Sequence, residues 1–111
     1  MIDSYSFGRM VIKGKSYASD VKIINNKVKS DWWRAEGHRL QLSDMEDVLE
    51  KKPKTIVVGT GHDGVMVVDA EVRDYCQKNN IQLIELKTAD AVKRFNELAG
   101  RGVAGLFHLT C

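Results

Sequence analysis

The stretch Thr55-Ile56-Val57-Val58-Gly59-Thr60-Gly61-His62-Asp63-Gly64 decides the fold of this chain. Ile56, Val57 and Val58 are apolar and β-branched, and an unbroken run of this kind predicts a strand covered on both faces of its sheet. The glycines that follow, at positions 59, 61 and 64, have the spacing G-x-G-x-x-G. We therefore expect a buried strand that runs directly into a glycine-rich loop, an arrangement typical of α/β proteins.

Two interpretations of this loop remain open from the residues alone. In the first, Gly59 and Gly61 only let the chain turn sharply away from a buried strand. In the second, the loop is the fingerprint of an NAD-type dinucleotide site, with Glu85, 21 residues after Gly64, binding the ribose hydroxyls. That fingerprint needs a helix N-terminus at the loop, whereas the predicted helix begins some residues later. The ligand-binding candidates are Gly59, Thr60, Gly61, His62, Asp63, Gly64, Glu85 and Arg101.

The composition bounds the class of protein. The chain has 111 residues, of which 43% are hydrophobic and 29% charged, as expected for one globular domain spanning residues 1–111. Its 17 basic and 15 acidic residues give a net charge of only +2, which is too small for nucleic acid or an anionic membrane to be the default partner. No apolar run has membrane-spanning length, and the N-terminus does not resemble a signal peptide. Cys76 and Cys111 lie far apart in the sequence and suit a reducing compartment, so a cytoplasmic location is expected.

The first half of the chain predicts β-hairpins. One hairpin joins residues 10–12 to 15–17 through Lys13-Gly14, and another joins residues 21–24 to 27–29 through Asn25-Asn26. Glycine and asparagine tolerate the positive φ angles that such turns require.

The second half predicts alternating helices and strands. A helix over 44–51 starts at an N-cap, Ser43, with Glu46 completing a capping box. Helices over 70–79, after an Asp69 cap, and over 89–99, after a Thr88 cap, follow the 3.6-residue period. Strands are expected over 55–58, 81–86 and 103–109, with residues 55–86 forming a parallel β-α-β crossover. The whole predicts α/β or α+β layers around one mixed sheet.

Aromatic and basic residues gather between residues 32 and 39. Trp32, Trp33, Arg34 and His38 are interface candidates, because tryptophan and arginine are enriched where proteins bind each other. If the segment is extended, one tryptophan faces the core and the other faces outward. A pocket wall or base stacking are the alternatives, and the near-neutral charge disfavours nucleic acid. Neither a catalytic nucleophile nor a metal-ligand spacing is present in the sequence.

Several short motifs occur in a fixed order along the chain. They are Y-S-F-G at 5–8, V-I-K-G-K-S-Y at 11–17, W-W-R-x-E-G-H at 32–38, I-V-V-G-T-G at 56–61, T-x-x-A-x-x-x-F-N-x-L at 88–98 and R-G-V-A-G at 101–105. Together they resemble the uncharacterised small-domain family that includes the adipogenesis-associated domain proteins and a mitochondrial complex I assembly factor. Gly59-Thr60-Gly61, Thr88, Asn96 and Arg101 match that family's motif positions. His62-Asp63-Gly64 is not typical of the family as a whole, which weakens the dinucleotide interpretation.

The resemblance implies a three-layer single domain, with a central mixed five-stranded sheet, helices on one side and an additional β-hairpin. It implies no established enzymatic activity and no cofactor, and its eukaryotic relatives act through protein partners. We therefore expect a non-enzymatic binding or assembly domain acting through a protein partner, including a second copy of the chain in a homodimer. The alternative is a protein or enzyme that binds a dinucleotide or other anion at the Gly59–Gly64 loop.

Overall fold

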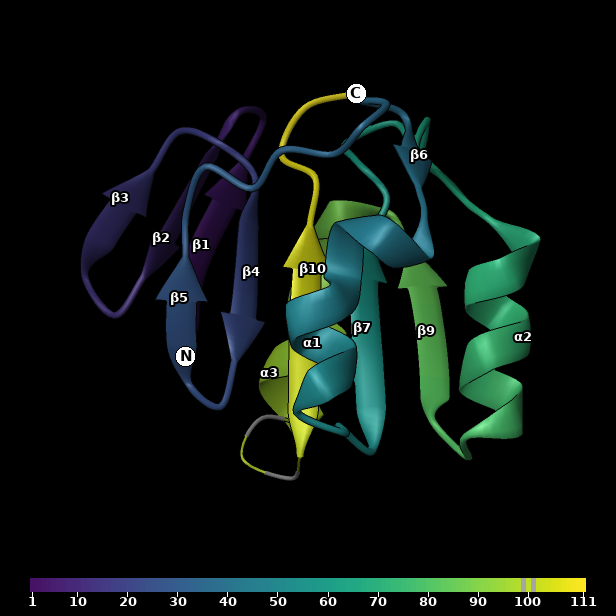
Figure 1. Ribbon diagram of the computed structural model, residues 1–111. Coiled ribbons are helices and arrows are strands. Elements are labelled where there is room, and N and C mark those ends of the chain that lie inside the picture. Colours follow the sequence, from purple (N-terminus) through teal and green to yellow (C-terminus); the bar gives the residue numbers. More distant parts are fainter. Residues whose placement is uncertain (99, 101) are drawn as a thin grey trace.

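A five-stranded mixed sheet forms the centre of the molecule (Figure 1). The computed structural model describes residues 1–98, 100 and 102–111. Within the sheet the strand order is β5-β4-β10-β7-β9. β7, β9 and β10 run parallel to one another, while β4 is antiparallel to β10 and β5 is antiparallel to β4. The predicted mixed sheet and the parallel β7-α2-β9 crossover are confirmed.

The elements have the following bounds: β1 Ile2–Ser6, β2 Arg9–Ile12, β3 Lys15–Tyr17, β4 Val21–Ile24, β5 Lys27–Lys29, β6 Arg39–Leu40, a 3₁₀ helix η1 Leu42–Met45, α1 Glu46–Glu50, β7 Thr55–Gly59, β8 Val67–Val68, α2 Ala70–Lys78, β9 Gln82–Leu86, α3 Thr88–Leu98 and β10 Val103–Phe107. The predicted helices and strands of the second half are all present, with ends that differ by one or two residues. The predicted last residue of the third helix, Ala99, lies outside the described residues.

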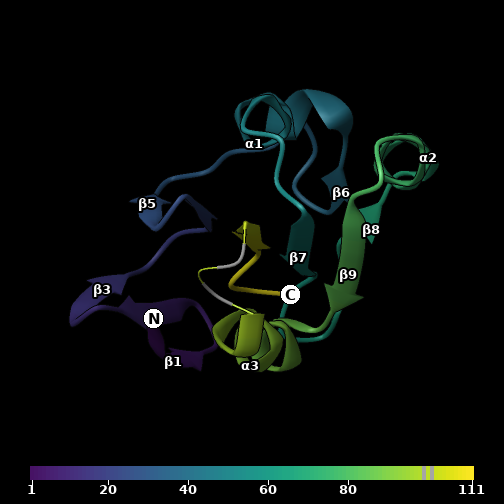
Figure 2. The same ribbon diagram turned by 90° about the horizontal axis from the view of Figure 1, so that it is seen from below.

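Both faces of β7 are buried, as its apolar run predicts. Ile56 and Val58 belong to a core shared with α1 and α2, while Val57 belongs to a second core shared with α3. Seen along the sheet, α1 and α2 therefore cover one face and α3 covers the other (Figure 2). The expectation of helices on one side is corrected in this respect, because a strand without a polar face has to be covered twice.

The additional β structure on the α3 side is a three-stranded sheet of order β1-β2-β3. Both predicted hairpins are confirmed. Lys13 and Gly14 have φ angles of 49° and 81°, and Asn25 and Asn26 have φ angles of 50° and 64°. Two successive positive φ angles match the twist of the flanking strands, so these residues set the register of the hairpins.

The first predicted helix begins two residues earlier than expected. The N-cap is Gln41, and the chain enters a 3₁₀ turn before α1. The Asp44 carboxylate accepts a hydrogen bond from the Gln41 N–H at 2.8 Å, which is the reciprocal half of a capping box. The assignment of Ser43 as N-cap was therefore wrong, because a carboxylate three residues after Gln41 captures the free N–H group instead.

The Asn96 side chain connects α3 to β1 through hydrogen bonds. Its side-chain oxygen accepts from the Ile2 N–H and its amide donates to the Ile2 carbonyl, both at 2.9 Å. This pair of bonds satisfies both backbone groups of Ile2 at the start of the small sheet. It gives the asparagine of the predicted F-N-x-L motif a structural role.

We predict that Asn96→Ala lowers the free energy of unfolding by about 1–3 kcal/mol, because it leaves two backbone groups of Ile2 unpaired. Urea denaturation measures the change. Asn79→Ala is the matched control, because its exposed side chain makes only one bond, to the Tyr75 carbonyl. Equal losses in the two variants would contradict the assigned role of Asn96.

Candidate functional site at the carboxyl ends of the parallel strands

The glycine-rich loop leaves β7 at the edge where the parallel strands end (Figure 1). The Thr60 N–H donates to the Leu86 carbonyl at 2.8 Å, so the loop is fixed to the end of β9. The Gly61 N–H donates to the Thr88 hydroxyl at 2.9 Å, and that hydroxyl donates to the His108 carbonyl. Thr88 was predicted as the N-cap of α3 but is its first residue. Its hydroxyl connects the loop to the end of β10.

The last residues of the chain lie against this loop. The His62 N–H donates to the Thr110 carbonyl at 2.8 Å, and the Val65 N–H donates to the Cys111 carbonyl at 3.0 Å. Gly61 has a φ of +111°, and a Cβ there would overlap the Cys111 carbonyl carbon. Gly61 is therefore required for a close backbone approach, and the approaching group is the chain itself.

This geometry does not fit a dinucleotide. α2 begins at Ala70, six residues after Gly64, so the helix that follows the loop in the chain does not start at the loop. The helix that does start there is α3, and its Thr88 N–H donates to the Gly61 carbonyl at 3.0 Å. The Asp63 N–H also donates to the Cys111 carbonyl, at 3.2 Å. The Glu85 carboxylate is held by Arg73 through two bonds of 2.8 Å. The amides and the acid that a pyrophosphate and a ribose need are already bonded to the protein.

A buried polar cluster that the sequence analysis missed lies beside the loop. Asp20 Oδ2 accepts from Arg34 Nη2 at 2.8 Å and from His108 Nδ1 at 2.7 Å. Asp20 Oδ1 accepts from the Leu109 N–H at 2.7 Å. The Arg34 side chain, only 3% exposed, also donates to the Gly37 carbonyl. We call Asp20, Arg34 and His108 the buried triad.

The pKa of Asp20 is lowered. Burial by itself raises the pKa of this carboxyl, but hydrogen bonds from His108, Leu109 and Arg34 to the ionised form outweigh it. A depressed carboxyl pKa contributes stability that is present above the pKa of the unfolded chain. That stability is lost as the pH falls through the lower pKa of the folded protein.

Two nitrogens of the buried triad have no hydrogen-bond partner among the described residues. They are Arg34 Nη1 and His108 Nε2, and both are fully buried. The Arg34 guanidinium stacks over the Trp32 ring at 4.7 Å, and the exposed His38 ring packs edge-on against His108 at 5.7 Å between centroids. Arg34 Nη1 is a donor and, with Nδ1 donating to Asp20, His108 Nε2 is an acceptor. A buried polar atom without a partner is costly, so these atoms mark where a polar ligand or water would bind best.

The remaining sequence candidates separate into buried and exposed residues. Trp32 is 5% exposed and donates to the Asp44 carbonyl, whereas Trp33 is 81% exposed. The expectation of one inward and one outward tryptophan is confirmed. His62 and Asp63 are exposed, and the His62 ring contacts Phe7 edge-on at 5.6 Å. The candidate Arg101 lies outside the described residues.

Among the residues that the structure describes, no group of three His, Cys, Asp or Glu side chains could hold a metal ion. Within the same residues, no helix is long and apolar enough to cross a membrane. Cys76 and Cys111 are both free thiols, and burial together with the charge of Glu85 raises the pKa of Cys76. Cys76 is therefore a core side chain with little thiolate character.

We predict that Gly61→Ala destabilises the protein by at least about 2 kcal/mol, because the new Cβ combines a positive φ with a backbone clash. Chemical denaturation measures the loss. Gly37→Ala is the control, because a Cβ at Gly37 meets no atom within 4 Å. A loss at Gly61 no larger than that at Gly37 would show that the terminal residues do not lie against the loop.

We predict that Asp20→Asn lowers the unfolding free energy by about 3 kcal/mol near neutral pH, because it leaves the Arg34 charge buried without its counterion. The difference from the unsubstituted protein should shrink as the pH falls through the lowered pKa of Asp20. Denaturation curves between pH 7 and about pH 2 test this. Asp74→Asn, at an exposed position, is the control. A difference independent of pH would contradict the assignment.

Comparisons with known proteins agree with this fold. The structure is similar to a conserved hypothetical protein of Pyrococcus horikoshii OT3, with a TM-score of 0.86 and 24% identity over 100% of this chain and 99% of that one. It is also similar to a protein named MT938, with a TM-score of 0.80 and 27% identity over 100% and 98% of the two chains. An outer membrane protein from Bartonella henselae shares the fold, with a TM-score of 0.82 and 23% identity over 99% and 94%.

The sequence comparison shows the family. Residues 2–108, almost the whole chain, match the family described as "Protein of unknown function (DUF498/DUF598)". The chain therefore belongs to the DUF498/DUF598 family.

Proposed function

We propose that this protein is a non-enzymatic binding domain whose partner is a protein that docks at the carboxyl ends of the parallel strands. One observation carries the proposal: four large apolar side chains are exposed, with Phe7 and Val65 beside the glycine loop, Val67 beside β6 and Trp33 beside η1 and α1. Phe7 is 56% exposed, Trp33 81%, Val65 44% and Val67 60%. We call these four residues the strand-end surface.

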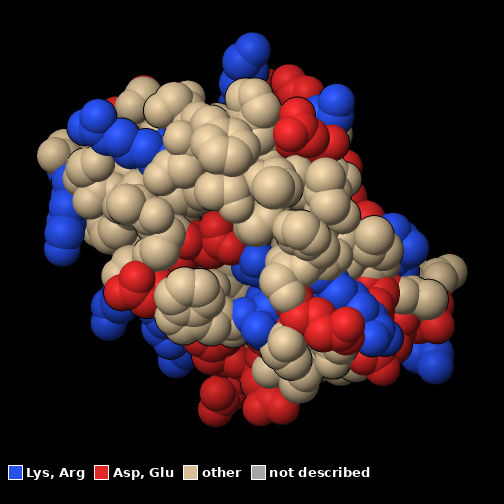
Figure 3. Space-filling view, turned by 90° about the horizontal axis from the view of Figure 1, so that it is seen from above, with Lys and Arg blue, Asp and Glu red and all other residues tan. Residues whose placement is uncertain are grey.

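The four residues come from separate segments that meet at one end of the molecule. The Val65 N–H donates to the Cys111 carbonyl, and Gly8, next to Phe7, donates to the Leu109 carbonyl at 2.8 Å. The Val67 N–H donates to the His38 carbonyl at 2.8 Å, and Trp33 precedes Arg34 of the buried triad. Figure 3 views this end and shows a broad area of uncharged side chains, with charged groups around its edges and most densely on one side.

The chemistry of this surface suits a protein partner. An exposed tryptophan offers a large rigid area with a polar N–H group, and such residues anchor many protein interfaces. Arg34 fixes the backbone beside Trp33 from within, so the indole is presented on a rigid support. The resemblance to assembly and adipogenesis-associated proteins points the same way, and a second copy of the chain is included among the partners. The two free cysteines favour a cytoplasmic location.

We predict that Trp33→Ser abolishes retention of the partner while leaving the melting temperature within about 2 °C, because the ring is 81% exposed. Quantitative affinity purification from native cells, comparing the intact protein with the variant, measures retention. Sedimentation velocity of both proteins shows whether the partner is a second copy. Lys93→Ser, on the outer side of α3, is the control. If the Trp33 and Lys93 variants retain the same proteins in equal amounts, the proposal that a partner binds the strand-end surface is refuted.

A second candidate function rests on the two unpartnered nitrogens, Arg34 Nη1 and His108 Nε2. A small oxyanion that keeps one proton, such as hydrogen phosphate, could accept from Arg34 Nη1 and donate to His108 Nε2, and so supply both missing partners. We therefore propose the buried triad, and not the loop amides, for this alternative, because the loop amides are bonded within the protein.

Nitrogen-15 NMR during titration with phosphate, acetate and NAD tests this second function. Binding at the triad predicts saturable shifts of the Arg34 and His108 side-chain nitrogens, whereas Arg39, paired with Glu36 and Asp69 at the surface, stays unchanged. Shifts confined to Arg39, or shifts that never saturate, would exclude a built site at the triad.

A further inference from the structure

The outer edge of β9 is the longer of the two edges of the five-stranded sheet. Among the described strands β9 pairs only with β7, so its other side is an edge (Figure 1). The Gln82 N–H donates to the Lys54 carbonyl, which shows that the backbone groups of Gln82 face β7. Because backbone groups alternate in direction along a strand, those of Leu83 and Glu85 point away from β7.

The outward backbone groups have no partner within the protein. Neither the N–H nor the carbonyl of Leu83 or Glu85 forms a hydrogen bond with any residue that the structure describes. Free donors and acceptors that alternate along a strand edge are a template for one more strand. Their spacing matches the backbone of an extended chain, which can bond to all of them at once.

The opposite edge of the sheet is protected against strand addition, and the edge of β9 is less so. β5 has three residues, and lysines stand on both sides of Val28. β9 has five residues and one charged side chain, Glu85, whose carboxylate is held by two hydrogen bonds from Arg73. Short length and lysines are common protections of an edge. The edge of β9 is therefore the one suited to accept another strand.

The side chains of β9 define what an added strand would meet on each face. Ile84 and Leu86 are half-buried against the core shared with α3. Leu83 and Glu85 alternate with them and lie on the α2 side, where Glu85 is paired with Arg73. Every second residue of an added strand would extend the apolar face on the α3 side. The other residues would meet Leu83 and the ion pair.

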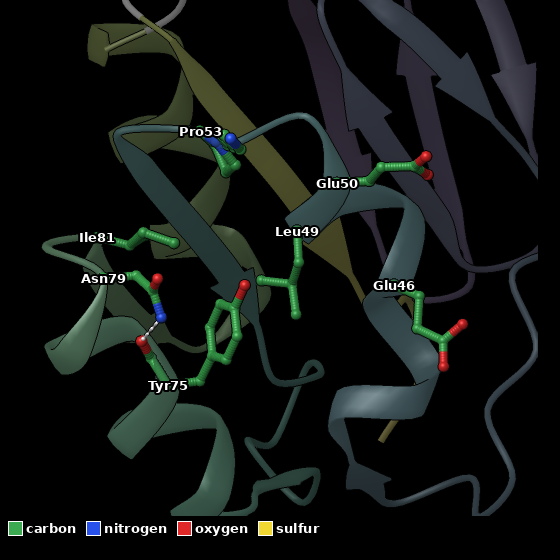
Figure 4. Close-up of a pocket in the computed structure, with 8 residues that line it drawn as sticks. Glu46, Leu49, Glu50, Pro53, Tyr75, Asn79 and Ile81 are labelled. Carbon is green, nitrogen blue, oxygen red and sulfur yellow. Dashed lines mark hydrogen bonds between the residues drawn. The ribbon is translucent and has the colours of Figure 1, made fainter.

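α2 stands outside β9 and would cover the added strand. Both ribbon views place α2 beyond the edge of the sheet and on the same face as α1 (Figure 1, Figure 2). Figure 4 shows the Tyr75 side chain of α2 directed toward Leu49 of α1. Arg73 lies two residues before Tyr75, or roughly 200° around the helix, so it occupies the flank turned away from α1. An added strand would run beneath this flank, with one face sheltered from water.

The position of α2 and the length of β9 favour an extended segment of a partner over a second copy of the chain. A two-fold dimer that paired β9 with β9 would bring both α2 helices to one face at the join. They would meet there, because each stands outside its own sheet (Figure 2). The five residues of β9 extend about 17 Å. A strip of that length buries less than the roughly 800 Å² per partner that is typical of a stable dimer.

We propose that the outer edge of β9 binds an extended segment of a partner protein as an additional strand, through the free backbone groups of Leu83 and Glu85. The segment carries apolar side chains at alternate positions, which continue the face formed by Ile84 and Leu86. The inference rests on the proposed function, that the domain acts through protein partners, and it adds a contact that does not involve Trp33.

The probe is a synthetic peptide of alternating valines and threonines between two terminal lysines, together with its analogue methylated on every backbone nitrogen. Amide NMR of the folded protein follows the titration. The first peptide should cause saturable shifts and slower hydrogen exchange at the Leu83 and Glu85 amides, while the Val28 amide of β5 stays unchanged. The analogue has the same side chains without N–H donors and should cause neither effect. Shifts with both peptides, or with neither at millimolar concentration, would overturn the proposal.

Glu85→Pro removes an outward N–H group without removing a bond to β7, because proline is tolerated where the N–H of an edge strand is free. It should weaken binding of the first peptide at least tenfold. Glu85→Ala is the matched control, because it loses the same ion pair with Arg73 but keeps the N–H group. Equal peptide binding by the two variants would overturn the proposal. If Glu85→Pro does not fold, the methylated peptide decides the question on the unsubstituted protein.

Sedimentation velocity separates a partner segment from a second copy. A dimer of the intact protein that persists in Glu85→Ala and is lost in Glu85→Pro would overturn the partner segment in favour of β9 self-pairing. The test also separates the edge from the strand-end surface. Failure of the peptide to bind, with Trp33-dependent retention intact, refutes the edge alone. Peptide bound at β9 without any Trp33-dependent retention supports the edge and refutes the strand-end surface.

Discussion

The close contact between residues 107–111 and the glycine loop is the constraint on which the rest of this molecule depends. A Cβ at Gly59 would lie 2.9 Å from the Thr88 hydroxyl and 3.0 Å from the Phe107 ring, and a Cβ at Gly61 would overlap the backbone of Cys111. The Thr88 hydroxyl links the two sides by accepting from Gly61 and donating to His108. Because three parallel strands end here, their loops must be closed by hydrogen-bonding groups from elsewhere in the chain. Gly59 and Gly61 therefore allow residues 107–111 to lie against the loop.

The buried triad makes this closure rigid. Asp20 joins the segment before β4 to Arg34 in the long connection and to the residues that follow β10. A carboxylate with three donors is well satisfied, so the connection carrying Trp32 and Trp33 is held in one position. The consequence for function is that the inward tryptophan completes the core, while the outward one is displayed on a firm support. Under the proposed function, binding through such a surface would lose little conformational entropy.

Much of the fold was predictable because local signals agreed with the tertiary structure. The Asn25-Asn26 turn, the unbroken apolar run before Gly59 and the 3.6-residue period of α3 each specify an element without reference to distant residues. The glycine spacing suggested a dinucleotide site, but spacing cannot show which groups contact the loop. In the structure the Asp63 and Val65 N–H groups donate to the Cys111 carbonyl. The triad was missed because Asp20 and His108 are 88 residues apart and belong to no motif. Placing helices on both faces required knowing that α3 follows the edge strand to the opposite side of the sheet.

Amide hydrogen exchange of the loop tests the central claim most directly, namely that the chain's own terminal residues occupy the glycine loop. In the intact protein, the account predicts protected amides at His62 and Val65, whose acceptors are the Thr110 and Cys111 carbonyls. Removing residues 110–111 should release these two amides to rapid exchange, while the Thr60 amide, bonded to Leu86, stays protected. Rapid exchange at His62 and Val65 in the intact protein would contradict the account, because the loop would then be open to a ligand.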